Sequence, residues 1–217
     1  MIQLKIYPFN PFQTNTYILW DETKEAIVID PSFSTEDEYQ IFQNFIKKES
    51  LNLKAAYNTH CHFDHCFGAF FLKEHLNMGY AAHRDGIIFT ENAAKQASVY
   101  GLQIGEIAPP SLFIDEGDII KFGESELRIL NTSGHADGSL CFVSDKDKIV
   151  ITGDVLFRES IGRTDLPTGN LDVLLESIHH KLFKLDGDYI VYPGHGPKST
   201  IAHEKANNPF LHFGEVF

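Results

Sequence analysis

Four apolar, strand-like runs in this chain each end at histidine or aspartate residues, and this repeated pattern constrains the fold more than any other feature of the sequence. A glycine just past a buried strand lets the backbone turn sharply, so that the next side chain can point into a cleft at the edge of a sheet. We therefore expect four strand ends to share one site. The runs and the residues that follow them are Leu53–Thr59 with His60, His62, Asp64 and His65, Leu127–Thr132 with His135, Ile149–Thr152 with Asp154, and Tyr189–Tyr192 with His195.

The residues at these strand ends are of types that bind metal ions. Imidazole and carboxylate groups suit zinc, iron or manganese, and none of the seven side chains is a thiol. Seven ligands are too many for one tetrahedral ion, but they suit two ions that share a bridging carboxylate and each keep a position for water. His60 and His62 lie two residues apart, so both can project to the same side of an extended segment. The sequence predicts a two-metal site.

The complete set of motifs resembles the signature of the metallo-β-lactamase superfamily. The similarity is greatest to the glyoxalase II-like hydrolases, particularly their short single-domain members. The segments that carry the resemblance are His60–His65, Thr152–Phe157, Ser160–Asn170, Tyr192–Pro197 and Asn208–Leu211, together with His135.

This resemblance implies an α+β fold, a four-layer αββα sandwich with the metal site at one edge between the sheets. The implied ligands are His60, His62 and His135 for the first metal, Asp64, His65 and His195 for the second, and Asp154 as the bridge. We expect two zinc ions, with iron or manganese as alternatives. A shared water of lowered pKa would then become a metal-bound hydroxide that attacks a polarised carbonyl. The predicted catalytic carboxylates are Asp64, which would also hold the hydroxide, and Asp154.

Arg163 is the predicted substrate-binding residue outside the ligand set. Glyoxalase II-like enzymes have a basic residue near the substrate carboxylate at this place, so the resemblance implies that Arg163 clamps an anion. A structural ion pair with Asp165 or Glu159 is the alternative interpretation. For His83, we weigh a ligand-orienting role against capping of the next helix, and we favour the cap.

We expect one domain over residues 1–217, because no linker, low-complexity segment or repeat divides the sequence. Full-length glyoxalase II has a C-terminal helical region that supplies much of its grip on glutathione, whereas this sequence stops shortly after His195. We therefore expect no separate glutathione-binding domain and weak recognition of a glutathione tail. Asp137 also departs from the family pattern, since it places a carboxylate beside a predicted ligand.

The formal net charge of −12 argues against a nucleic-acid partner, because basic surfaces supply most of the affinity for nucleic acids. It does not argue against an anionic substrate, since two divalent ions would outweigh the charges of Asp64, Asp154 and a hydroxide. No apolar segment has the length needed to cross a bilayer, and the N-terminus does not read as a signal peptide. An odd count of three cysteines suggests reduced thiols and a cytoplasmic location. Cys61 should face away from the ligands on either side of it.

The first half of the sequence predicts an antiparallel meander and then helices, and the second half repeats this order. Two such sets of strands indicate two sheets packed face to face with helices outside. The expected strands are Ile2–Tyr7, Asn15–Trp20, Ala26–Asp30, Leu53–Tyr57, Ile119–Phe122, Glu126–Leu130, Leu140–Ser144, Lys148–Thr152 and Tyr189–Tyr192. The expected helices are Glu36–Lys48, Asp64–His75, Arg84–Tyr100, Leu171–Leu185 and Thr200–Ala206.

The leading hypothesis is a binuclear metal hydrolase that acts on a small-molecule thioester, such as S-lactoylglutathione, or on a related ester. The alternative is a persulfide dioxygenase of the same superfamily, which resembles this chain in the Gly162–Asp165 segment but uses one Fe(II) held by two histidines and an aspartate. A nuclease and a secreted lactamase fit less well, since the chain is acidic and lacks an export signal. Metal count and oxygen consumption would distinguish the thioester hydrolase from the persulfide dioxygenase.

Overall fold

The computed structural model describes residues 1–211, and its first half forms a mixed six-stranded sheet. Strands β1 to β3 form an antiparallel meander, as predicted, and β3 to β6 continue the sheet in parallel. The strands in spatial order are β1 (Gln3–Phe9), β2 (Thr14–Trp20), β3 (Glu25–Ile29), β4 (Asn52–Tyr57), β5 (Tyr80–Ala82) and β6 (Leu112–Phe113).

The second half forms another six-stranded sheet and a separate small hairpin. Antiparallel pairs run from β7 to β10, whereas β13 lies parallel to β10. The spatial order is β14 (Ser199–Thr200), β13 (Ile190–Pro193), β10 (Ile149–Gly153), β9 (Leu140–Ser144), β8 (Ser125–Asn131) and β7 (Ile119–Phe122). The hairpin consists of β11 (Leu156–Phe157) and β12 (Ser160–Ile161).

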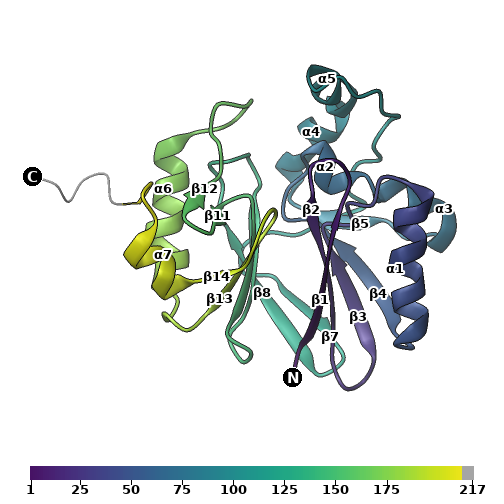
Figure 1. Ribbon diagram of the computed structural model, residues 1–217, viewed down its shortest axis with the longest axis horizontal. Helices are drawn as coiled ribbons and strands as arrows, with labels where there is room; N and C mark the ends of the chain where they lie inside the picture. Colours follow the sequence, from purple (N-terminus) through teal and green to yellow (C-terminus); the bar gives the residue numbers. More distant parts are fainter. Residues whose placement is uncertain (212–217) are drawn as a thin grey trace, which may run out of the picture.

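Helices cover the outer faces of the two sheets (Figure 1). The helices of the first half are α1 (Glu36–Lys48), α2 (Phe63–Cys66), α3 (Ala69–Leu76), the 3₁₀ turn η1 (Arg84–Gly86), α4 (Ile87–Glu91) and α5 (Ala93–Val99). Those of the second half are α6 (Leu171–His180), the 3₁₀ turn η2 (Leu182–Lys184) and α7 (Ile201–Asn207). Among the described residues, no helix is both long and apolar enough to cross a membrane.

Side-chain alternation in the central strands explains the layers. On β2, Tyr17 and Leu19 pack between the sheets, whereas Ile18 packs on the opposite side with the helices of the first half. On β10, Ile151 lies between the sheets and Val150 packs with α6 and α7. Because both faces of these strands are buried, each sheet is enclosed by the other sheet and by helices. The α+β fold and the four-layer αββα sandwich are confirmed.

The two sheets are joined at the edge where the predicted site residues lie. Thr14 on β2 forms a β-bridge with His195 after β13, and the backbone N–H of Asn15 donates to the carbonyl of Gly194 at 2.7 Å. The hydroxyl of Tyr17 donates to the carbonyl of Pro193. These contacts fix the loop after β13, in the second sheet, against a strand of the first sheet.

The expected helix over Asp64–His75 is wrong in one respect, because it is divided at Gly68. A side-chain carbon added to Gly68 would lie 2.3 Å from the carbonyl oxygen of Pro31. The backbone N–H of Gly68 donates to that carbonyl in place of a helical partner, so the helical hydrogen bonding is interrupted between α2 and α3. The expected helix over Arg84–Tyr100 is likewise divided into η1, α4 and α5.

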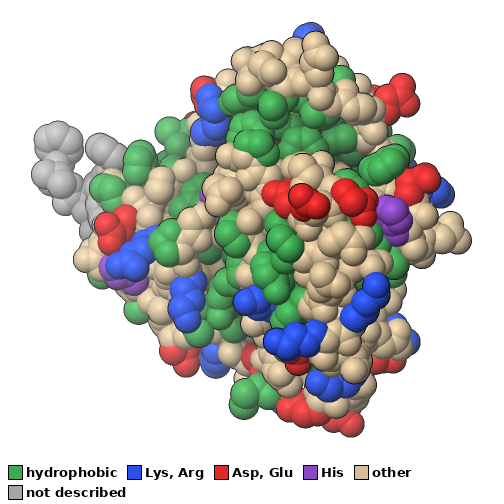
Figure 2. Space-filling model, turned by 45° about the vertical axis from the view of Figure 1, so that its right-hand side comes forward, with side chains coloured by type: hydrophobic (Ala, Val, Ile, Leu, Met, Phe, Trp, Pro, Cys, Tyr) green, Lys and Arg blue, Asp and Glu red, His purple; other side chains and the backbone are tan. Residues whose placement is uncertain are grey.

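Hydrophobic side chains gather on the surface in the upper part of the view in Figure 2, in the region of α4 and α5, while lysine and arginine side chains gather below it. The exposed apolar residues of these helices include Ile88 and Val99. This part of the molecule borders the site described next.

Candidate metal centre

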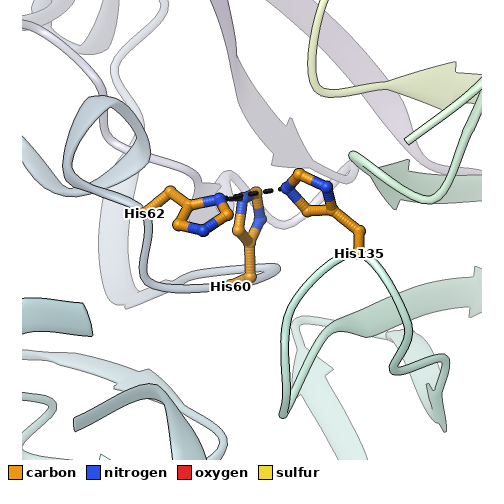
Figure 3. Close-up of side chains that lie close together, drawn as sticks. All are labelled: His60, His62 and His135. Atoms are coloured by element: carbon orange, nitrogen blue, oxygen red, sulfur yellow. Dashed lines mark hydrogen bonds between the residues drawn. The ribbon is translucent and has the colours of Figure 1, made fainter. Parts of the chain in front are cut away.

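Three of the predicted histidines form one compact group. His60 and His62 lie in the loop after β4, and His135 lies in the loop after β8, so the group joins both halves of the chain (Figure 3). Nδ1 of His62 lies 3.1 Å from Nε2 of His60 and 3.0 Å from Nε2 of His135. These three nitrogens point toward one another and can hold a single metal ion.

A second group contains Asp64 and His65 from α2 and His195 from the loop after β13. Oδ2 of Asp64 lies 3.6 Å from Nε2 of His65 and 3.4 Å from Nε2 of His195. Nitrogen and carboxylate oxygen thus converge as they would around a second ion.

Asp154 lies between the two groups. One carboxylate oxygen is 3.4 Å from Nε2 of His65, and the other is 3.7 Å from Nε2 of His135 and 3.4 Å from Nε2 of His195. The turn after β10 therefore places one carboxylate within reach of both groups. The structure brings all seven predicted ligand residues together at the expected edge of the sandwich.

The second ring nitrogens of four histidines are held by other parts of the chain. Nδ1 of His60 lies 3.1 Å from the hydroxyl of Thr59, and Nδ1 of His65 lies 3.0 Å from Oδ2 of Asp30. Nδ1 of His135 and of His195 face backbone carbonyl oxygens, those of Arg163 and Phe12 respectively. Such partners fix the ring orientation, so each Nε2 faces the centre.

Asp30 is a site residue that sequence analysis missed. Its buried carboxylate accepts hydrogen bonds from the backbone and hydroxyl of Thr59, in addition to its contact with His65. Asp30 follows β3 directly, so it shares the strand-end signal that identified Asp154. Thr14, which donates to Oδ2 of Asp64 at 2.9 Å, carries no comparable signal in the sequence.

Burial and charge give the two groups different electrostatic character. Burial lowers the pKa of His62 to about 3, with a further contribution from His135, and burial likewise lowers the pKa of His60. Burial opposes ionisation of Asp64, but His65 and His195 outweigh it and lower the pKa of Asp64 to about 2. Burial also opposes a charge on His195, yet its contacts with Asp154 and Asp64 raise the pKa of His195 to about 10.

These shifts fit a cation site on two counts. Neutral His60 and His62 keep lone pairs available for a metal ion. Asp64 and Asp154 are largely buried, and contacts with His65 and His195 lower the pKa of both against the effect of burial, so these carboxylates require positive charge beside them. Nε2 of His65 and Oδ1 of Asp154 are also buried without any hydrogen-bond partner among the described residues. Unpaired buried polar atoms that face each other are what divalent metal ions would satisfy.

A cavity of about 760 Å³ opens onto this centre, and its lining includes candidate ligand residues from both groups. Arg163 borders the cavity, as the substrate-binding hypothesis requires. Its guanidinium also forms the alternative ion pair, with two contacts of 2.7 Å to the carboxylate of Asp165, and donates to the hydroxyl of Tyr100 at 3.3 Å. The ion pair with Asp165 and a position beside the cavity therefore occur together.

The structure also shows the surroundings of His83 and Cys61. His83 caps η1, because its Nδ1 accepts a hydrogen bond from the backbone of Asp85 at 3.1 Å. Cys61 is buried in the core on the helix side of the first sheet, so it faces away from the clustered histidines as expected.

Gly194 provides a test of how tightly the centre is packed. A methyl group at this position would lie 2.1 Å from Oδ1 of Asp154 and 2.8 Å from Cε1 of His65. Gly194→Ala should therefore displace the carboxylate and weaken binding of divalent metal by at least about tenfold. Elemental analysis and metal titration would measure the loss. Gly105→Ala is the matched control, because a methyl group there meets nothing within 4 Å, and an equal loss in the control would contradict the steric explanation.

Comparison with known proteins agrees with this geometry. The chain is 38% identical over 213 residues to "Hydroxyacylglutathione hydrolase GloC" of Haemophilus influenzae, covering 97% of this chain and 98% of the relative. It is 34% identical to "Persulfide dioxygenase ETHE1, mitochondrial" of Homo sapiens, covering 91% of this chain and 71% of the relative.

Solved structures show the same fold. The crystal structure of BLEG-1 B3 metallo-beta-lactamase has a TM-score of 0.88 at 32% identity and covers 97% of this chain and 100% of its own. TTHA1623, solved in a di-iron-bound form, has a TM-score of 0.85 at 31% identity and covers 95% of this chain and 100% of its own. The family model for the metallo-beta-lactamase superfamily matches residues 9–195. A match of that length, with relatives aligned along nearly the whole chain, means that this protein belongs to the metallo-β-lactamase superfamily.

Proposed function

We propose that this chain is a binuclear metal-dependent hydrolase of small thioesters, S-lactoylglutathione or a related acyl thioester or ester. The observation that carries the proposal is the position of Asp154 between two groups of three ligands, His60, His62 and His135 on one side and Asp64, His65 and His195 on the other. The similarity to a hydroxyacylglutathione hydrolase supports the substrate class. We expect zinc, with iron or manganese as alternatives, because nitrogen and oxygen ligands discriminate poorly among these metals.

Two bound divalent ions would lower the pKa of a water toward neutrality and polarise the thioester carbonyl. The residues of the chain position the reacting groups. Thr14 donates a hydrogen bond to Oδ2 of Asp64, and Asp64 borders the cavity, so its carboxylate is placed to hold the attacking water. Water then adds to the carbonyl carbon, the bond from carbon to sulfur breaks, and the thiolate leaves and takes up a proton. The products are a carboxylic acid and a thiol.

We propose a cytoplasmic location for this reaction, since the three cysteines are buried free thiols that suit a reducing compartment.

Arg163 would bind a substrate carboxylate at the mouth of this cavity. Asp165 already holds two of its nitrogen atoms, so a substrate anion would compete with the Asp165 carboxylate or use the side that faces Tyr100. Arg163→Ala should raise KM for an anionic thioester by about threefold to tenfold and change kcat less. Asp165→Asn should have the opposite effect and lower KM, because it frees the guanidinium. Steady-state kinetics on both variants would test this, and a raised KM in both would indicate that the ion pair only supports the loop.

One observation favours a second function, a mononuclear Fe(II) persulfide dioxygenase. The human relative of that name aligns with 91% of this chain. Such an enzyme would use a persulfide and molecular oxygen, and one group of ligands would be sufficient.

The number of bound ions decides between the two functions. Protein expressed in metal-replete medium should contain close to two ions per chain, because each group offers three candidate ligands. Elemental analysis, thioester hydrolysis and oxygen uptake with a persulfide should be measured on the same sample. One ion per chain together with oxygen uptake would favour the dioxygenase, provided that the ion count is unchanged in Asp64→Ala. Failure of the two-ion form to hydrolyse any thioester would reject the proposed function.

A further inference from the structure

One face of helix α5 forms a wall of the cavity. Asn92, Lys95, Gln96 and Val99 all line it, and their spacing of three and four residues places them on one side of the helix. An adjacent face is packed, because Ala93 and Ala97 are buried against Phe63. The helix therefore has a fixed rotation, and Lys95 is presented to the cavity.

The wall between α5 and the metal centre is aromatic. The rings of Phe12, Phe63 and Tyr100 contact one another, with centroid separations of 5.3, 5.4 and 5.8 Å. All three border the cavity, as do the apolar side chains of Ile88 and Leu166. An apolar or aromatic part of a ligand would therefore be accommodated beside the metal centre.

The charges around the cavity are asymmetric. Among its described lining residues, the only carboxylates are Asp64 and Asp154 of the metal centre, whereas Lys95 and Arg163 are the lysine and arginine residues. Arg163 is already paired with Asp165. Within residues 1–211, other lysines such as Lys54 and Lys181 form ion pairs, but no carboxylate lies within ion-pair distance of Lys95. Lys95 is thus the lining cation without an anionic partner.

We infer that Lys95 binds the remote carboxylate of the substrate, and that the substrate has an apolar or aromatic segment between this carboxylate and the thioester. This inference rests on the proposed function and names the substrate class for it. Lys95 is a binding residue and takes no part in bond breaking. It supplies charge recognition at one end of the cavity, and the aromatic wall supplies contact area between the two ends.

The same arrangement disfavours a ligand that also carries an ammonium group. An ammonium needs a carboxylate or several acceptors, and the lining carboxylates already serve the metal centre. A glutathione tail has two carboxylates and one ammonium, so it would leave a cation poorly paired. We therefore expect thioesters of an apolar thiol with a single carboxylate to have a lower KM than the corresponding thioesters of glutathione.

Two thioesters of lactate with matched aromatic thiols test the inference. One carries 4-mercaptobenzoate and the other 4-mercaptobenzamide, so they differ in the remote charge. Lys95→Ala should raise KM for the benzoate by about fivefold and leave KM for the benzamide and both kcat values within about twofold. Lys95→Arg should retain the preference for the benzoate. Lys121→Ala, which removes an exposed lysine from β7, is the control and should change neither substrate.

A binding measurement keeps this test separate from that of the proposed function. Calorimetry would measure the affinity for the two corresponding thioethers, which cannot be hydrolysed. Lys95→Ala should weaken binding of the carboxylate-bearing thioether by about fivefold and leave binding of the carboxamide-bearing thioether unchanged. If no thioester is hydrolysed but this selective loss occurs, the hydrolase assignment fails and the role of Lys95 stands. If Lys95→Ala affects the two ligands equally, or affects neither, the role of Lys95 is overturned whatever the enzyme hydrolyses.

Discussion

Asp154→Ala is expected to lower thioester turnover by at least about a hundredfold and to reduce the metal content from two ions to about one per chain. Asp154 is the carboxylate that reaches both ligand groups, with contacts to His65, His135 and His195. Without it, two cations would face each other with less screening, so the more weakly held ion should be lost. Elemental analysis and kinetics under the same metal concentration would measure both effects.

Glu126→Ala is the control for this change, because it removes an exposed carboxylate from β8. It should leave metal content and turnover unchanged. Retention of two ions by Asp154→Ala, with turnover within about threefold of the parent enzyme, would contradict the bridging role and the two-metal mechanism together.

Asp30→Ala should combine a large loss of stability with a loss of metal affinity. The change leaves the backbone and hydroxyl of Thr59 and Nδ1 of His65 without their buried partner. We expect unfolding to require about 3–5 kcal/mol less free energy, and metal binding to weaken by about tenfold to a hundredfold. Denaturant titration of the metal-free protein and metal titration of the folded protein measure the two losses separately.

Two variants distinguish the structural role of Asp30 from its role at the metal centre. Asp30→Asn keeps the size of the side chain and should cost less stability, but an amide cannot serve His65 as a carboxylate does. Glu204 is another buried carboxylate, held by Ser199, Asn208 and the backbone of Glu159. Glu204→Ala should destabilise the fold and leave metal affinity of the folded protein unchanged, and an equal loss of affinity would contradict a specific role for Asp30.

The sequence predicted the strands of the central layers because their apolar runs and the turns that follow are local features. Strand β9 was predicted with its observed bounds, Leu140–Ser144. Strands β5, β6, β11, β12 and β14 were missed, because two or three residues are too few to show a period. The division of the helix at Gly68 depends on Pro31, and no local pattern reports a contact with a residue so far along the chain.

The same limit applies to the site. Histidine and aspartate at strand ends identified the seven residues that the structure brings together, because that signal lies within a few residues of sequence. The partners that orient them, such as Thr14 at Asp64 and the carbonyl of Phe12 at His195, come from a different strand or loop. Lys95 was missed for a similar reason, since only the packing of α5 directs it toward the cavity.

The β-bridge between Thr14 and His195 limits the order in which the site can assemble during translation. Synthesis proceeds from the N-terminus, so His60, His62 and His135 are all made before Asp154, and His195 is added last of the seven. The edge that joins the two sheets can therefore close only after His195 has been made. The group of His60, His62 and His135 can therefore assemble before the group of Asp64, His65 and His195, which requires β13 to pair with β10. In the proposed two-metal enzyme, the ion position that includes His195 would therefore be the later of the two to be completed.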